Sequence, residues 1–361
     1  MIDPTLRFRD FDFKVSDRQF ERGPTEPKDV RLVVVDARNG RIEHDAFTNL
    51  ASYFGRADLL LENSAGIGRS RLQGVTEGGA RIDVCFLLDR PGSQWECVVL
   101  GDGVDAPKSG TFELAGGAVK GRLLGKTQDF DGPYWIEKNR YRGYRGLIEV
   151  SLTPEVLRRE LDARGSYMHP WYTNLNDLPE ETLNPAGVTS ATAALLAEPS
   201  RRMDEHIRAA LRERGVERAV MTLFMNFSWQ QARPEQRLTD YRMNPERIAM
   251  ADDEVAKLRA ALAAGKRVTG VGTSGIRVVE SLPNLEGGYS GETDCFIAPG
   301  FKLRHSHGLL TNLHNPMGTH VIMAAAIGGH ALVMDAYREC VELGYHFGIH
   351  GDSMLVFAPN A

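Results

Sequence analysis

The sequence has little that points to export, to metal binding or to a membrane. Its four cysteines are Cys85, Cys97, Cys295 and Cys340. No two of them form a C-x-x-C pair, so neither a zinc knuckle nor a disulfide framework is indicated. The N-terminus lacks the apolar core of a signal peptide, and the longest apolar run, residues 321–334, is too short to span a bilayer. We therefore expect a cytoplasmic protein without a membrane partner.

No strong charge excess suggests nucleic acid or a membrane surface as a partner of the whole chain. The formal net charge is −5, and the contents of 42% hydrophobic and 25% charged residues are ordinary for a globular protein. A chain of 361 residues is expected to hold about two domains. Only a local basic patch would favour nucleic acid.

Hydrophobic patterning predicts two kinds of structure along the chain. Between residues 71 and 150, short alternating segments separated by Gly, Pro and Asp indicate a small β-barrel. On either side, strand-like runs such as residues 31–36 alternate with helical segments such as residues 252–264, which indicates an α/β domain. We therefore predict a main α/β domain from residues 1–70 and 151–361, with residues 71–150 inserted as a β-barrel domain.

One stretch of the barrel segment interleaves cations with tyrosines. Residues 138–145 read K-N-R-Y-R-G-Y-R, and such a pattern can bind phosphates and stack on bases. The alternative is a hairpin whose cations are solvated and whose tyrosines pack on the barrel. The isolation of this patch in an acidic chain favours the alternative.

The most distinctive stretch, residues 267–281, passes from an apolar strand through a glycine-rich turn into a helix. Such a turn directs backbone N–H groups and the positive end of the helix dipole at a bound anion. Thr273 and Ser274 add hydroxyls, and Arg277 adds a planar group suited to a carboxylate or phosphate. The alternative is a purely structural turn in which Arg277 pairs with Glu280.

The last quarter of the chain holds seven of its ten histidines. His305 and His307 have the spacing of a metal pair, but no cysteine or carboxylate at ligand spacing joins them, which favours a surface strand. His314 follows an apolar strand within residues 311–316, where polar groups can face a ligand. It is a candidate acid, base or donor, with a packed structural histidine as the alternative. Asp352 lies in another polar turn, where its simplest role is to cap the turn.

Five motifs follow one another in the last third of the chain. They are V-G-T-S-G-I-R-V-V-E-S at 271–281, F-I-A-P-G-F at 296–301, L-L-T-N-L-H-N-P at 309–316, A-Y at 336–337 and G-D-S-M at 351–354. In order and spacing they resemble motifs of the S-adenosylmethionine:tRNA ribosyltransferase-isomerase family of the queuosine pathway. The resemblance covers nearly the whole chain, and it implies an α/β domain that carries an inserted β-barrel.

The resemblance also implies an unusual use of S-adenosylmethionine (SAM) as a co-substrate, without a metal. The family transfers the ribosyl part of SAM, rather than its methyl group, to the amine of a 7-aminomethyl-7-deazaguanine base in tRNA. Adenine and methionine leave. The sulfonium acidifies its neighbouring carbons, so that a base can remove a C5′ proton. Such a site needs a base, a clamp for the methionine carboxylate and the exclusion of water.

The middle of the chain departs from the family motifs. Three family histidines are replaced by Leu196, Phe224 and Asn244, and two family glycines are missing from residues 223–230. We interpret these changes as a rebuilt acceptor pocket, so that the ribosyl part of SAM is used on a small molecule or within SAM itself. The expected partner is then a small-molecule acceptor rather than tRNA. Two alternatives stay open: the family reaction on tRNA, and a SAM-binding protein that has lost its chemistry.

On this interpretation each candidate site residue has an expected role. His314 or Glu246 is the general base, and Asp352 orients one of these groups or a ribose hydroxyl. The residues expected to bind SAM are Gly272, Thr273, Ser274, Arg277, Thr311 and Asn312. The residues expected to line the acceptor pocket are Thr192, Phe227 and Trp229. No metal ligand is assigned.

Overall fold

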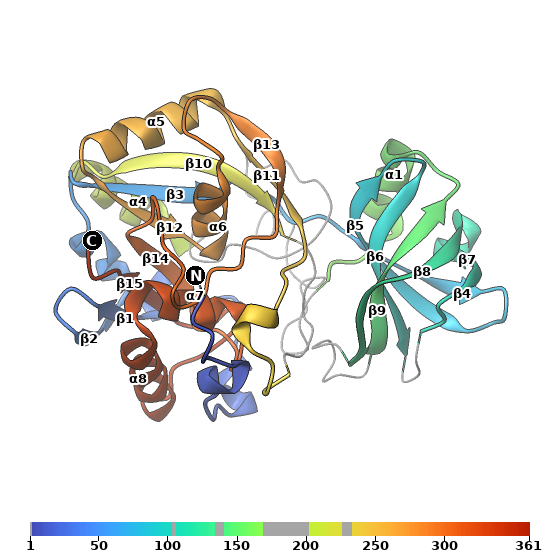
Figure 1. Ribbon diagram of the computed structural model, residues 1–361, viewed down its shortest axis with the longest axis horizontal. Coiled ribbons are helices and arrows are strands. Elements are labelled where there is room, and N and C mark those ends of the chain that lie inside the picture. Colours follow the sequence, from blue (N-terminus) through green and yellow to red (C-terminus); the bar gives the residue numbers. More distant parts are fainter. Residues whose placement is uncertain (1, 103–105, 134–140, 169–201, 226–232) are drawn as a thin grey trace. The chain divides into compact units, whose positions relative to one another are not determined.

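The computed structural model of the chain describes residues 2–102, 106–133, 141–168, 202–225 and 233–361 (Figure 1). The chain divides into two compact units. The first unit comprises Met1–Ser64, Ala197–Leu223 and Ala232–Ala361, and the second comprises Ala65–Leu196 and Phe224–Gln231.

The first unit is built on a mixed sheet of nine strands, which confirms the predicted α/β class. In sheet order the strands are β13 (Tyr289–Thr293), β11 (Glu246–Met250), β10 (Glu217–Phe224), β3 (Asp58–Asn63), β12 (Arg267–Val271), β14 (Gly308–Asn312), β15 (Ser353–Phe357), β1 (Arg31–Asp36) and β2 (Arg41–Ala46). Strands β10, β3, β12 and β14 are parallel neighbours, whereas β14 and β15 are antiparallel. The sheet therefore has one run of parallel strands whose carboxyl ends share an edge.

Helices pack on both faces of this sheet, because successive strand side chains point to opposite faces. In the described residues of this unit the α-helices are α4 (Glu205–Glu213), α5 (Asp252–Ala263), α6 (Thr273–Ser281), α7 (Thr319–Gly328) and α8 (His330–Glu342), and the 3-10 helices are η1 (Phe8–Phe11), η2 (Asp17–Gln19), η3 (Pro27–Asp29), η4 (Phe47–Tyr53) and η8 (Leu238–Asp240). Leu310 of β14 shares a core with η4 and α4. On the other face, a Cβ added at Gly328 of α7 would lie 2.5 Å from Val356 of β15. None of the helices in the described part of the chain is long and apolar enough to cross a bilayer.

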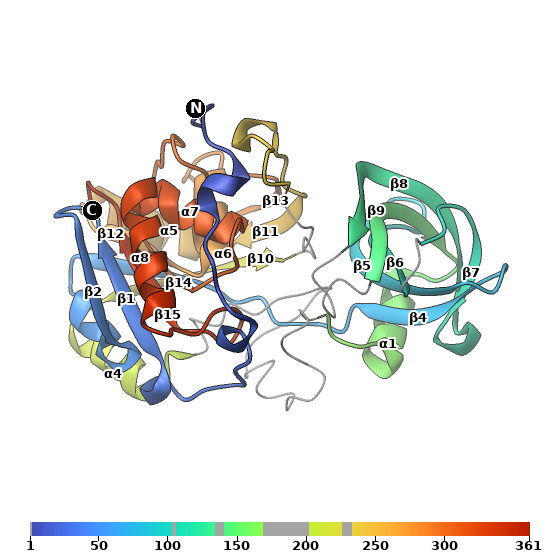
Figure 2. The same ribbon diagram turned by 90° about the horizontal axis from the view of Figure 1, so that it is seen from below.

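The N-terminal segment lies beside α7 and α8, as the dark blue ribbon in Figure 2 shows. The Phe11 ring packs edge-on against His330 of α8, and the Phe13 ring packs against Tyr337, with centroids 4.8 and 4.9 Å apart. Met317, in the loop before α7, donates its N–H to the carbonyl oxygen of Phe11 at 3.0 Å. The N-terminal segment therefore helps to fix the loop between β14 and α7.

The second unit contains a closed barrel of six antiparallel strands, which confirms the predicted β-barrel. Around the barrel the strands are β4 (Arg71–Thr76), β5 (Arg81–Arg90), β6 (Gln94–Asp102), β9 (Tyr141–Val150), β8 (Val119–Pro133) and β7 (Gly110–Leu114), with η5 (Ala115–Gly117) and helix α1 (Pro154–Arg164) in the same unit. Alternate residues such as Phe86, Val99 and Ile148 fill the core, and Leu157 of α1 packs against them. The domain boundaries, with 71–150 as the insertion, remain a proposal.

The stretch that interleaves cations with tyrosines is partly built into this barrel. Tyr144 is 1% exposed in the core, and its hydroxyl donates to the carbonyl oxygen of Pro107 at 2.8 Å. Arg145 is also 1% exposed and forms an ion pair with Glu96 at 2.7 Å. Residues 138–140 lie outside the described residues. The packed alternative is thus confirmed for Tyr144. The side chains of Tyr144 and Arg145, two of the eight residues, are buried in the barrel and are not accessible to a nucleic acid.

Candidate functional site

The turns that follow β12 and β14 lie side by side at the carboxyl edge of the parallel strands. Val271, the last residue of β12, pairs with Glu62 of β3 on one side and with Leu310 of β14 on the other. The first turn carries residues 272–274, and the second carries residues 313–316. Ligands of open α/β sheets bind at this edge. The fold therefore brings two of the predicted motifs together.

The turn after β12 leads directly into helix α6. Gly272 has a φ of +85°, which favours glycine, and it donates its N–H to the carbonyl oxygen of Leu310 at 2.7 Å. Gly275 packs so closely on β3 that a Cβ there would lie 3.0 Å from the carbonyl oxygen of Leu61. Ser274 Oγ is buried and has no hydrogen-bond partner in the part of the chain that the structure describes. A buried hydroxyl at the positive end of a helix dipole is suited to a bound anion.

Arg277, in the second turn of α6, is held by groups of the protein itself. Its guanidinium forms an ion pair with Glu246, the first residue of β11. It also donates from Nε to the carbonyl oxygen of Cys295 at 3.1 Å and from Nη2 to that of Thr293 at 3.4 Å. Arg277 and Glu246 are only 5% and 4% exposed, and burial lowers the pKa of Arg277 to about 10. Two predicted site residues with separate expected roles are thus in direct contact.

Glu280, the alternative partner of Arg277, is engaged elsewhere. Its carboxylate accepts from the backbone N–H groups of Arg304, His305 and Ser306 at 2.7, 3.0 and 2.9 Å. It also accepts from the Ser306 hydroxyl at 2.8 Å. The local pair expected from helix spacing is therefore replaced by the long-range pair with Glu246.

His314 is fixed by contacts from three directions. Its Nε2 lies 2.9 Å from Thr311 Oγ1, and its backbone N–H donates to the Tyr337 hydroxyl at 3.3 Å. Its ring stacks on His320 with centroids 4.2 Å apart and planes inclined by 14°. Burial and repulsion from His320 lower the pKa of His314 well below its usual range, and burial with the charge of Arg277 lowers the pKa of His320 to about 4. Both shifts favour the neutral form of the ring.

Asn312 belongs to the opposite face of the sheet from Thr311, because the two are consecutive residues of β14. Its amide nitrogen donates to the carbonyl oxygens of Gly348 and Ile349 at 3.1 and 2.8 Å. Its amide oxygen accepts from Arg202 at 3.3 Å. Thr311 and Asn312 were expected to bind SAM together, and the structure separates their side chains.

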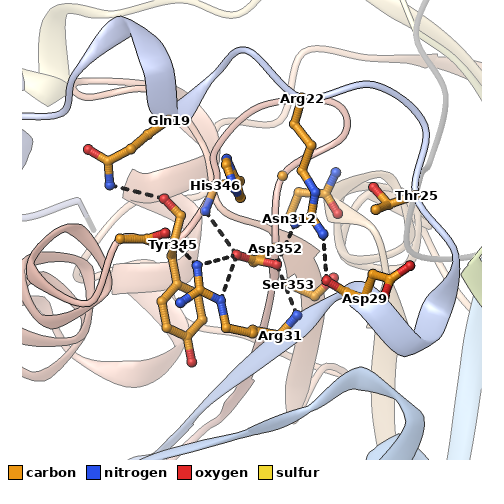
Figure 3. A network of polar contacts seen from close by, with 12 residues as sticks. Gln19, Arg22, Thr25, Asp29, Arg31, Asn312, Tyr345, His346, Asp352 and Ser353 are labelled. Atoms are coloured by element: carbon orange, nitrogen blue, oxygen red, sulfur yellow. Dashed lines mark hydrogen bonds and ion pairs between the residues drawn. The ribbon is translucent and has the colours of Figure 1, made fainter.

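Asp352 is a fully buried hub between the N-terminal segment and the loop that carries His314 (Figure 3). Its Oδ1 accepts from Arg22 Nη1 at 2.8 Å and from the N–H of Arg31 at 2.9 Å. Its Oδ2 accepts from Arg31 Nε at 3.2 Å and from the N–H of His346 at 2.9 Å. Its backbone carbonyl accepts from the N–H of Leu313 at 2.9 Å. The arginines and backbone N–H groups thus occupy the carboxylate of Asp352. The contact with the loop that carries His314 is made by the backbone carbonyl of Asp352.

The Asp352 hub predicts a large loss of stability on a nearly isosteric change. Asp352→Asn is expected to lower the free energy of unfolding by about 3 kcal/mol, because Arg22 and Arg31 lose the negative charge that they share. Urea denaturation followed by circular dichroism measures this loss. The matched control is Asp335→Asn, whose pair with Arg338 is exposed and is expected to contribute less than about 1 kcal/mol. Equal losses in the two variants would contradict a stabilising role for the hub.

Three residues around these groups were not predicted from the sequence. Tyr337 lies in the A-Y motif at 336–337, which was the signal for it, but no role was assigned to it. No sequence motif indicated His320 or Arg202. The contacts of these residues with His314 and Asn312 form only when the chain folds. The predicted acceptor-pocket residues, Thr192, Phe227 and Trp229, lie outside the described residues.

The histidine pair at 305 and 307 lies before β14, at the end of the strand opposite to His314. His307 Nδ1 accepts from the N–H of Val268 at 3.2 Å. Burial lowers the pKa of both His305 and His307. Within the ranges that the structure describes, no three His, Cys, Asp or Glu side chains are grouped as metal ligands.

Comparison with known proteins gives matches over almost the whole chain. A family model described as queuosine biosynthesis protein matches residues 8–356. The chain is 30% identical to the S-adenosylmethionine:tRNA ribosyltransferase-isomerase of Moorella thermoacetica and 26% identical to that of Aquifex aeolicus, and each match covers 97% of this chain and 100% of the relative. The crystal structure of an S-adenosylmethionine tRNA ribosyltransferase from Thermotoga maritima is similar in fold, with a TM-score of 0.53 and 24% identity over 96% of this chain and all of that one.

Proposed function

The chain belongs to the queuosine biosynthesis protein family, and from that premise we propose that it is a SAM-dependent transferase-isomerase that acts on tRNA. Relatives that it matches end to end carry the name S-adenosylmethionine:tRNA ribosyltransferase-isomerase. In the proposed reaction the ribosyl part of SAM is transferred to a base of tRNA. The proposal is supported by His314, which Thr311 and His320 hold beside the α6 turn, and by family and relative matches over almost the whole chain.

The expectation of a small-molecule acceptor in preference to tRNA is wrong. The relatives that match across both units are named for action on tRNA. The expectation rested on Leu196, Phe224 and Asn244 in place of three family histidines and on two glycines missing from residues 223–230. Such replacements alter the fit of a pocket locally, and they do not by themselves identify a different class of acceptor.

His314 is the proposed general base, in preference to Glu246. A proton on Glu246 would leave the buried charge of Arg277 without its counter-ion, which is costly. His314 is not the counter-ion of a buried charge, and burial favours its neutral form, in which one ring nitrogen can accept a proton. If Nε2–H of His314 donates to Thr311 Oγ1, then Nδ1 is the free nitrogen that accepts the proton. The sulfonium of bound SAM supplies the acidity of the C5′ hydrogen.

The start of α6 is the proposed site for the methionine carboxylate of SAM. Thr273 and Ser274 offer backbone N–H groups at the positive end of the helix, and Ser274 adds a buried hydroxyl that no described residue satisfies. Arg277 is the less suitable clamp, because Glu246 and two carbonyl oxygens already hold its guanidinium. In this proposal Arg277 stabilises helix α6 through its contacts with Glu246, Cys295 and Thr293 and does not bind SAM itself.

Ser274→Ala is expected to weaken SAM binding by about tenfold without loss of stability. The hydroxyl has no partner in the described part of the free protein, so its removal should leave the free energy of unfolding unchanged or slightly raised. Isothermal titration calorimetry with SAM and urea denaturation measure the two quantities. The matched control on the same helix is Ser281→Ala, whose hydroxyl donates to the carbonyl oxygen of Arg277 at 2.7 Å. This control should lose stability and keep its affinity for SAM, and the reverse pattern would contradict the assignment.

The proposed function is tested by the products of SAM. The protein is incubated with SAM, with and without tRNA that carries the 7-aminomethyl-7-deazaguanine base, and the products are identified by mass spectrometry. Adenine and methionine released only with this tRNA would support the proposal. Release of adenine and methionine in the absence of tRNA would contradict the proposal that tRNA is the acceptor. SAM binding without release in either case would favour a binding protein that lacks the chemistry.

A further inference from the structure

His320 contacts His314 and has no role in the reaction described so far. The chain reverses direction between β14 and α7 through residues 315–318, so that His320 lies in the first turn of α7. Gly318 donates its N–H to the carbonyl oxygen of Asn315 at 3.1 Å, and a Cβ on Gly318 would approach that oxygen to 2.9 Å. This tight turn places one imidazole ring on the other. The contact therefore results from the loop geometry as well as from the two side chains.

We propose that His320 is a positioning residue for His314, and that it acts through the parallel stacking of its ring. The inference rests on the proposed function, in which His314 accepts a proton from C5′. The stack, with planes inclined by 14°, opposes tilting of the His314 ring. The bond of 2.9 Å between Nε2 and Thr311 Oγ1 opposes rotation of the ring within its plane. Together the two contacts hold Nδ1 in one direction, and the rate of a proton transfer depends strongly on such alignment.

The charge of Arg277 bears on His320 rather than on the hydrogen bond of His314. The positive charge of Arg277 acts on His320 and disfavours a proton there. Glu246, the other candidate base, is already paired with Arg277. When a proton moves from C5′ to Nδ1 of His314, the electron pair of the broken C–H bond remains on the carbon beside the sulfonium.

Two variants of His320 separate stacking from hydrogen bonding. His320→Ala removes the ring, and it is expected to lower kcat about 30-fold while the KM for SAM changes less than about twofold. His320→Phe keeps a flat ring without nitrogen atoms, and it is expected to retain at least about a third of the wild-type kcat. The rate measured is adenine release from SAM in the presence of the modified-base tRNA. His330→Ala, a histidine of α8 outside the site, serves as the control for loss of a packed imidazole.

Either of two results would overturn the inference. A wild-type kcat in His320→Ala would show that the stack does not position His314. A kcat in His320→Phe as low as that in His320→Ala would show that the nitrogen atoms of His320, rather than its ring, are needed.

A measurement without turnover separates this inference from the proposed function. The nitrogen-15 signals of the His314 ring report its tautomer and its order in the free protein. They should change in His320→Ala and persist in His320→Phe. If the wild-type protein releases no adenine with tRNA, the proposed function fails, and these signals still decide whether His320 positions His314. Unchanged signals in His320→Ala would count against positioning.

Discussion

His314→Ala is expected to lower kcat for adenine release by about 10³-fold while the protein remains folded. The variant removes the proposed base, and a positioned acid or base contributes about 10²- to 10⁴-fold to a rate. The ring is half-buried, and its contacts with Thr311 and His320 lie at the carboxyl edge of the sheet rather than in the core. The rate of adenine release with the modified-base tRNA, measured by mass spectrometry, checks the prediction.

The control for this variant is His330→Ala. His330 is also half-buried; its ring packs against Phe11, and its Nε2 lies 2.8 Å from the carbonyl oxygen of Asp10. Its loss should lower the melting temperature and leave kcat unchanged. If His314→Ala kept the wild-type kcat, His314 would be the packed structural histidine that the sequence alone also allows.

The position of the site on the fold was predictable from local patterns. An apolar strand followed by Gly272 and a helix indicates a turn at a carboxyl edge, and a second strand before His314 indicates another. The parallel pairing of β12 with β14 places these turns together. The barrel was predictable for a similar reason, because its alternating segments need only their neighbours to form a closed sheet.

The partners of the individual side chains were not predictable from spacing. Arg277 and Glu246 are 31 residues apart, and they meet only because β11 and α6 fold next to each other. The local rule for helices considers only i,i+3 and i,i+4 neighbours, and so it names Glu280. Asp352 likewise forms ion pairs with Arg22 and Arg31, which lie near the other end of the sequence. Long-range pairs of this kind depend on the topology of the sheet.

The alternation of side chains along β14 adds a distinction that the motif does not give. Thr311 and Asn312 are adjacent in a predicted strand, and adjacent strand residues point to opposite faces. Only one of them can therefore face a ligand on a given side of β14. The structure places Thr311 with His314 and places Asn312 with Arg202. The motif includes both residues, but the alternation of side chains along the strand directs them to different faces of the sheet.

The buried pair of Arg277 and Glu246 predicts the largest effect on stability. Arg277→Met and Glu246→Leu, made singly, are each expected to lower the free energy of unfolding by about 3–5 kcal/mol, because each leaves one buried charge without its partner. Urea denaturation followed by circular dichroism at 222 nm is the suitable measurement, because most of the described helices belong to the α/β unit.

The double variant decides whether the two single losses come from an unpaired charge. Arg277→Met combined with Glu246→Leu removes both charges, so it is expected to be more stable than either single variant, which requires a coupling energy larger than the larger of the two single losses. Some loss should remain, because the carbonyl oxygens of Cys295 and Thr293 lose their donor. Additive losses would mean that the two side chains stabilise the fold independently, and would remove the reason for preferring His314 over Glu246 as the base. A recovered double variant would support that preference, because the same penalty for an unpaired Arg277 would apply whenever Glu246 accepted a proton.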